Sequence, residues 1–80
     1  MTEEFTITIA SDPEHEKVFA EVHCDGKFVA LVSQENGLDR LRVEFPGSDV
    51  DESMIERAVD MEGFKLALIS AARRLVEQKP

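Results

Sequence analysis

Strict alternation of apolar and polar residues predicts the first strand of this chain. In FTITIA (5–10), Phe5, Ile7 and Ile9 share one face and the two threonines share the other. This two-residue period is typical of a half-buried β-strand. The polar stretch SDPEHE (11–16) then interrupts the pattern with a proline and predicts a loop.

Two further strands are predicted on either side of the dipeptide Asp25-Gly26. KVFAEVHC (17–24) and KFVALVSQ (27–34) are rich in β-branched and aromatic residues. A two-residue Asp-Gly loop between such runs favours a hairpin with a type I′ turn, because both turn positions need positive φ. In 17–24 we expect Val18, Ala20 and Val22 to face the core, and Phe19 to be partly covered or at an edge. Both faces of 27–34 are apolar, so we expect this strand to be central in the sheet.

A second tight turn is predicted at Asn36-Gly37, followed by a half-buried strand LDRLRVEF (38–45) that ends at Pro46-Gly47. The residues of this strand expected to face inward are Leu41, Val43 and Phe45. The run MIERAV (54–59) fits either a short fifth strand or one helical turn capped by Ser53. We favour the strand.

A helical period follows from residue 61 to residue 78, with Asp60 as the predicted N-cap. One apolar stripe, expected to be buried, is formed by Met61, Phe64, Leu68, Ala71 and Leu75. Gly63 in the first turn costs ~1 kcal/mol relative to alanine, which suggests a close approach to the sheet. A second apolar stripe consists of Leu66, Ile69 and Val76. Either the loop 46–60 covers it, or it forms a dimer or partner contact.

These elements predict a single α+β domain over residues 1–80. Its antiparallel meander sheet would have four to five strands, with one C-terminal helix packed on one face. The other face of the sheet would be left to solvent or to a partner.

The charge distribution narrows the classes of function. The formal net charge of the chain is −8, and residues 1–16 and 46–62 carry −5 each. Such a surface repels nucleic acid and anionic lipid and attracts basic partners. We therefore expect no nucleic-acid partner and no membrane partner. The sequence contains no secretory signal and no apolar run long enough to span a membrane, so we expect a cytoplasmic protein.

The residues capable of catalysis or metal binding form no recognisable set. Cys24 and His23 are strand neighbours, so their side chains should point to opposite faces. His15 and His23 lack metal-ligand spacing, and one cysteine cannot form the common zinc sites. The glycines form no phosphate-binding pattern. We therefore expect no catalytic residues, no metal, no cofactor and no enzymatic activity.

The acids between the last strands and the helix remain the candidate site. Within 46–62 the sequence holds six acids and one base. Solvated surface is their simplest explanation. The other interpretation is a protein-binding patch, and the residues that we assign to it are Asp49, Asp51, Glu52 and Glu56.

The chain as a whole resembles a known family over residues 17–76. The residues that carry the resemblance are KVFAEVHCDGKFVALVSQENG, then LRVEF, then RAVDMEGFKLALISAARRL. They are similar to the small acidic immunity proteins of bacterial polymorphic-toxin and contact-dependent growth inhibition systems. The resemblance implies a protein that binds and neutralises a cognate toxin domain, in many systems a nuclease with a basic cleft. It also implies that 46–62 is the variable, partner-facing segment.

Two other classes of function remain open. The chain could be a small housekeeping adaptor or a homodimer, with acids that serve solubility only. It could also mimic nucleic acid, although two acidic clusters on loops fit the regular rows of a mimic poorly. A toxin gene ending just upstream would favour the immunity protein, and an unrelated operon would favour the adaptor.

Overall fold

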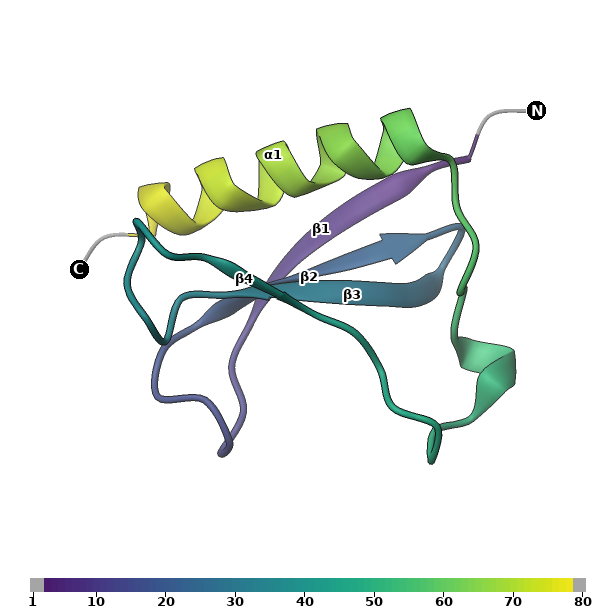
Figure 1. Cartoon of the computed structure of the whole chain (residues 1–80), viewed down its shortest axis with the longest axis horizontal. Helices are drawn as coiled ribbons and strands as arrows, with labels where there is room; N and C mark the ends of the chain where they lie inside the picture. The colour runs from purple at the N-terminus through teal and green to yellow at the C-terminus, as the bar shows by residue number, and fades with distance from the viewer. Residues whose placement is uncertain (1–2, 79–80) are drawn as a thin grey trace.

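The computed structural model describes residues 3–78 and contains one sheet and one long helix (Figure 1). The elements in chain order are β1 (Phe5–Ala10), β2 (Phe19–Cys24), β3 (Lys27–Ser33), β4 (Arg42–Glu44), the 3-10 helix η1 (Glu52–Met54) and α1 (Met61–Glu77). The four strands pair antiparallel in the order β1-β2-β3-β4. This confirms the predicted α+β meander, with β3 in a central position. Among residues 3–78, no helix has the length and apolar character needed to cross a membrane.

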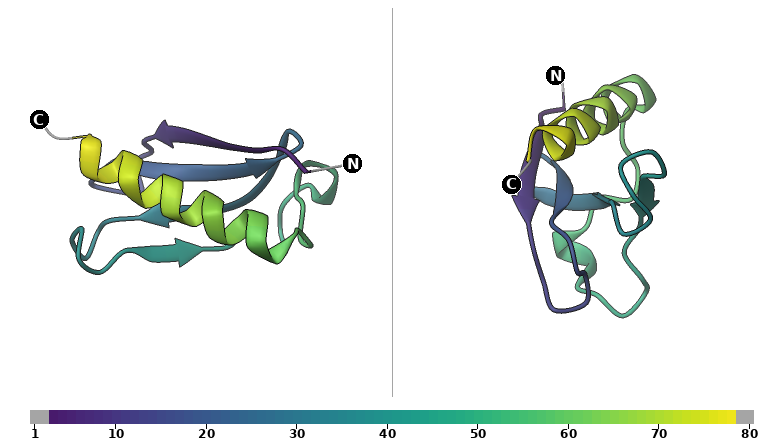
Figure 2. Two further views of the ribbon diagram at one scale, coloured as in Figure 1. Left: turned by 90° about the horizontal axis from the view of Figure 1, so that it is seen from above. Right: turned by 90° about the vertical axis from the view of Figure 1, so that its left-hand side faces the viewer.

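The core lies between α1 and one face of the sheet. Figure 2 shows α1 crossing the sheet obliquely, with β1 and β4 at opposite edges. Alternate residues of the strands face the helix and are buried there. The buried cluster comprises Ala20, Val22, Cys24, Val29, Ala30, Val32, Ala67, Ala71 and Leu75. The pairing of β2 with β3 is irregular between Val22 and His23.

The start of α1 agrees with the sequence prediction. The Asp60 side chain accepts a hydrogen bond of 2.7 Å from the Gly63 N–H and so caps the helix. A Cβ atom on Gly63 would lie 2.6 Å from Cε2 of Phe5, so the absence of a side chain does permit the close approach of α1 to β1.

The predicted buried stripe of α1 is correct except at its first residue. Leu75 and Ala71 are buried, and Phe64 and Leu68 are half-buried. Met61, however, is 79% exposed. Helical side chains lean toward the helix N-terminus. The side chain of Met61 therefore extends past the first turn of α1, beyond the part of the helix that packs on the sheet.

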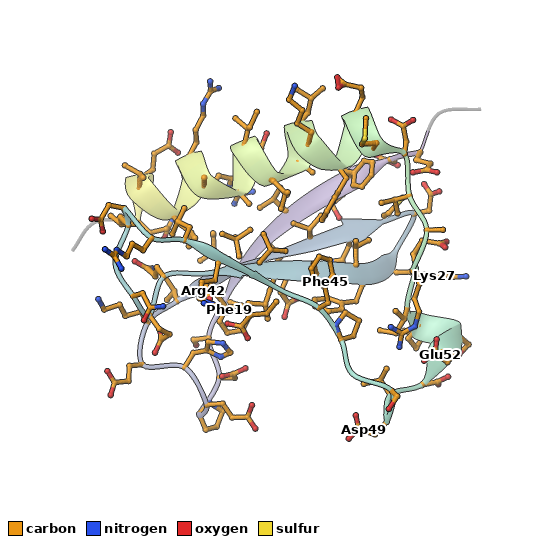
Figure 3. All side chains as sticks on the ribbon, in the orientation of Figure 1. Phe19, Lys27, Arg42, Phe45, Asp49 and Glu52 are labelled. Carbon is orange, nitrogen blue, oxygen red and sulfur yellow. The ribbon has the colours of Figure 1, made fainter. Side chains whose placement is uncertain are left out.

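The face of the sheet away from α1 is covered in part by the loop 11–18. Phe19 lies on this face (Figure 3) and is only 2% exposed, so the prediction of a partly covered ring is wrong. The His15 ring lies 4.7 Å from the Phe19 ring, centroid to centroid. The Asp12 carboxylate holds His15 in place through a 2.8 Å contact with Nδ1. The position of this loop could not be read from strand alternation, because it depends on a tertiary contact.

The connection from β3 to β4 contains the tight turn predicted at Asn36-Gly37, formed by residues 34–37, and a second turn directly after it. Two consecutive turns follow β3, in which Gly37 N–H donates to Gln34 O at 2.9 Å and Arg40 N–H donates to Gly37 O at 3.1 Å. Gly37 has a φ of +100°, which explains why a glycine occupies this position. These turns use the start of the predicted strand 38–45, and only Arg42–Glu44 pairs with β3.

The expected fifth strand over 54–59 is reduced to a single bridge. Ile55 forms one parallel bridge with Phe28, and Glu56 N–H donates to Phe28 O at 2.9 Å. Residues 52–54 form η1 instead, because Asp51 caps that turn. The segment therefore follows the open end of β3 without becoming a strand.

Candidate protein-binding surface

Arg57 holds the acidic loop between β4 and α1 in one shape. Its Nε and Nη2 donate to the two carboxylate oxygens of Glu52 at 2.7 and 2.6 Å. Nη2 also donates to the carbonyl oxygen of Gly47 at 2.7 Å. This two-pronged pairing is geometrically specific, and it joins the beginning, the middle and the end of the loop. The Arg57 guanidinium lowers the pKa of Glu52 below its usual range.

A second carboxylate shapes the tip of the same loop. The Asp51 side chain accepts hydrogen bonds from the Ser53 N–H at 3.0 Å and from the Ser53 hydroxyl at 2.7 Å. These bonds cap η1 and lower the pKa of Asp51.

The end of the loop is fixed to the start of the chain. The Glu3 carboxylate accepts hydrogen bonds from the Asp60 N–H at 2.9 Å and from the Cys24 thiol at 3.5 Å. Glu3, one of the acids near the N-terminus, therefore positions the residue that caps α1.

The four predicted partner-binding residues differ in how they are held. Glu52 uses both carboxylate oxygens in its pair with Arg57, whereas a single oxygen of Asp51 accepts the two bonds from Ser53. Asp49 is exposed at the loop tip (Figure 3), and Glu56 is half-buried beside a cavity. Within residues 3–78, neither Asp49 nor Glu56 has a salt bridge. Of the four residues, only Glu52 is paired with a base in the described part of the chain, so the charges of Asp49, Asp51 and Glu56 remain available to a partner.

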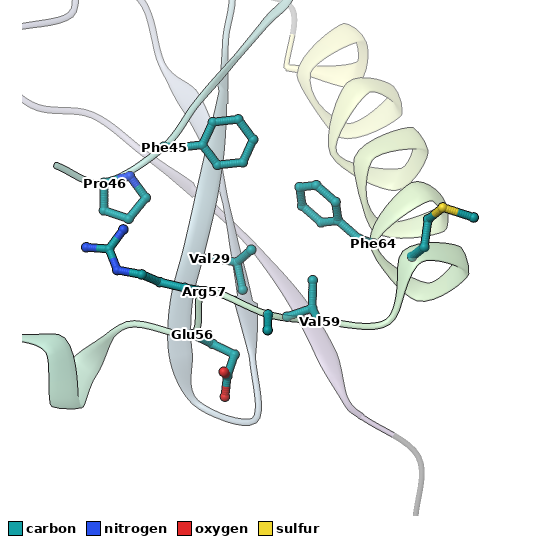
Figure 4. A pocket seen from close by; sticks show the side chains of 9 residues that line it. Val29, Phe45, Pro46, Glu56, Arg57, Val59 and Phe64 are labelled. Atoms are coloured by element: carbon teal, nitrogen blue, oxygen red, sulfur yellow. The ribbon is translucent and has the colours of Figure 1, made fainter. Parts of the chain in front are cut away.

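Beside Glu56 lies an apolar cavity of about 380 Å³. It opens where the loop and the start of α1 diverge from β3. Figure 4 shows the Phe45 and Phe64 rings next to each other, with Val29 and Val59 below them. The full lining is Val29, Phe45, Pro46, Glu56, Arg57, Ala58, Val59, Met61 and Phe64. The volume lies at the lower end of the range for ligand pockets, ~300–1,000 Å³, and it can accept one large apolar side chain.

Large apolar side chains are exposed at this cavity and in the acidic loop. Phe45 is 67% exposed and Met61 is 79% exposed, and both line the cavity. Met54 in η1 is 58% exposed. Aromatic residues and methionine are enriched at protein interfaces. We call the surface formed by these three side chains, the cavity, Asp49 and Glu56 the loop patch.

Sequence reasoning missed the apolar part of the loop patch. The alternation pattern predicts Phe45 on the inner face of a strand, and the helical period predicts Met61 in the buried stripe of α1. A signal was present, because Phe45 directly precedes Pro46-Gly47 and a residue at that position is outside regular pairing. Met61 could not have been found in this way, because its exposure depends on where α1 lies on the sheet.

The residues considered for catalysis lie apart, as expected for strand neighbours. Cys24 is buried in the core, and burial raises the pKa of its thiol to about 11, so the reactive thiolate is disfavoured. His23 lies on the other face, with its ring edge-on to Phe28 at 5.7 Å between centroids. Across residues 3–78, no three His, Cys, Asp or Glu side chains gather as a metal site would require.

Comparisons of the chain with protein-family models, with curated proteins and with solved structures found no match.

Proposed function

We propose that the chain is a cytoplasmic immunity protein that binds a cognate toxin domain, basic and of nuclease type, through the loop patch. The observation that carries the proposal is the exposed Phe45 and Met61 beside an open apolar cavity. A domain of this size gains nothing in stability from exposing these side chains, and grouped exposed apolar residues are typical of interaction sites.

The charges around the cavity indicate the kind of partner. The segment 46–62 carries −5, and its loop is held in shape by Arg57 and Asp51. An acidic loop next to an apolar cavity suits a basic protein surface that inserts one apolar side chain. The acids would speed the encounter, and the apolar contact would slow dissociation. The assignment of the partner as a toxin rests on the family resemblance alone.

The proposal is tested with the toxin domain encoded by the neighbouring gene, by binding kinetics on the full chain. Asp49→Lys should slow association with the toxin domain. This decrease in rate should become smaller as the salt concentration rises, because the Debye length falls from ~30 Å at 0.01 M to ~3 Å at 1 M. Phe45→Ala should speed dissociation by roughly 30-fold, as expected for an interface residue worth about 2 kcal/mol.

Each variant has a matched control at the opposite end of the sheet. Asp39→Lys makes the same charge change in the turn after β3, and Leu38→Ala truncates an exposed apolar side chain there. Both controls should bind like the parent protein. A toxin domain that does not bind at all would refute the function. Binding that Asp49→Lys and Phe45→Ala alter no more than their controls do would refute the loop patch as the contact.

A further inference from the structure

The strand β1 presents an unpaired edge whose outward-facing backbone groups can be identified. Asp25 N–H donates to Glu4 O at 2.8 Å, so the Glu4 carbonyl faces β2. Backbone groups alternate between the two sides along an antiparallel strand. The N–H and C=O groups of Phe5, Ile7 and Ile9 therefore point away from β2. Arg74 Nη1 donates to Ile7 O at 2.9 Å, which agrees with this assignment.

The residues of β1 make this edge complementary to itself. If two copies pair antiparallel with Ile7 on the two-fold axis, Phe5 faces Ile9 of the other copy and Thr6 faces Thr8. The outward-facing groups of both strands then meet in closely spaced pairs, as antiparallel hydrogen bonding requires. Apolar residues thus pair on the helix side and threonines on the other side, both of which are favourable cross-strand pairs.

The same register keeps the acids next to β1 from facing one another directly, in two chains that each carry a formal charge of −8. Glu4 would face Ala10 of the other copy, and Glu3 would face Ser11. No acid of β1 or its flanks stands directly opposite another acid. A strand of six uncharged residues at a free edge is the sort of site where sheets join.

An apolar groove beside β1 extends this surface onto the helix. A cavity of about 280 Å³ lies between β1 and α1, lined by Phe5, Ile7, Gly63, Leu66, Ala67 and Ser70. None of these residues is charged, and Leu66 is 60% exposed. The loop 46–60, which could have covered this stripe of α1, runs along the β3 edge instead (Figure 2). In a two-fold pair, the two copies of α1 would lie on the same face of the joined sheet, and each Leu66 would border the shared groove.

From this edge and groove we infer that the chain forms a homodimer through β1, in which two four-stranded sheets join into one. On association the Ile7 carbonyl exchanges its bond with Arg74 for a bond with the partner strand. The loop patch lies toward the other edge and stays free. The homodimer therefore does not depend on the proposed toxin binding.

The register can be tested by a pair of matched double substitutions. Thr6 and Thr8 are exposed and stand opposite His23 and Glu21 of β2. Both variants carry Thr8→Glu, so the repulsion from Glu21 within the chain is the same in each. Thr6→Glu with Thr8→Glu places like charges opposite each other twice across the two-fold axis, and should weaken the dimer about 2- to 30-fold. Thr6→Lys with Thr8→Glu places an introduced lysine opposite an introduced glutamate, and should restore or tighten the dimer.

The measurement is sedimentation equilibrium of the full chain across a wide range of concentrations. Thermal unfolding followed by circular dichroism, in dilute solution, confirms that both variants remain folded. A chain that is monomeric at every concentration would overturn the inference. So would a dimer that the two double substitutions affect equally, because charge pairing across β1 would then be absent.

Discussion

At the scale of single residues, several carboxylates of this protein stabilise the local structure, as helix caps or in an ion pair. Asp60 caps α1, Asp51 caps η1, and Glu52 pairs with Arg57. The Asp60 cap could be predicted because it precedes a clear helical period. The Glu52–Arg57 pair could not, because it depends on the path of the loop back to Gly47.

The contact between Asp12 and His15 gives a prediction on titration. The Asp12 carboxylate, followed by Glu44, raises the pKa of His15, and His15 lowers the pKa of Asp12. Asp12→Asn should therefore lower the pKa of His15, measured by NMR titration of its ring protons. Asp39→Asn, an exposed acid in another turn, should leave it unchanged. An equal pKa of His15 in all three proteins would contradict the contact.

The same contact should make stability depend on pH. The pKa of His15 is raised in the folded protein. Its contribution to the free energy of unfolding is therefore fully present below the pKa of the unfolded chain, about 6.5, and is lost as the pH rises through the folded pKa. The pKa of Asp12 is depressed, so its contribution is present above about 3.9 and is lost at lower pH. The free energy of unfolding lost in Asp12→Asn should thus be largest between about pH 4 and 6.5.

At the scale of elements, the sequence predicted the structure correctly where a local pattern alone determines it. The Asp25-Gly26 turn, with positive φ at both residues, and the 3.6-residue period of α1 required no tertiary information. Prediction was only partly correct at 38–45, where residues 42–44 form β4, and at 54–59, where the expected strand is a single bridge. In both segments alternation was present, but pairing depended on a neighbouring strand. A pattern of period two predicts a strand only if a partner edge is in reach.

The packing of α1 gives a prediction on stability. Leu75 is 2% exposed in the core, so Leu75→Ala should lower the free energy of unfolding by about 2–5 kcal/mol. Leu66→Ala removes the same atoms from a side chain that is 60% exposed. It should change the free energy of unfolding by at most about 0.5 kcal/mol. Urea denaturation of dilute protein measures both. Equal losses in the two variants would contradict the observed face of the helix.

At the scale of the whole molecule, the two edges of the sheet have different character. The β1 edge is uncharged over six residues, whereas the β3–β4 side carries the acidic loop and its apolar cavity. An acidic chain can meet a basic partner at the charged side and a copy of itself only at the neutral one. The possibility of a homodimer, left open by the sequence, is therefore compatible with toxin binding.

The separation of the two edges predicts that the two associations are independent. Substitutions at distant sites with no shared contacts usually have additive effects. Asp49→Lys should leave the dissociation constant of the homodimer unchanged. Thr6→Glu with Thr8→Glu should leave the rate of dissociation from the toxin domain unchanged, although its added charge can speed association.

The stoichiometry of the complex completes this test. Light scattering after size exclusion should give two chains with two toxin domains for the parent protein, and one with one for the double glutamate variant. If the double glutamate variant also loses the toxin domain, binding requires the dimer, and the toxin must then contact both copies. That result would move the contact from the loop patch toward the two-fold axis at β1, where Leu66 of each copy lies.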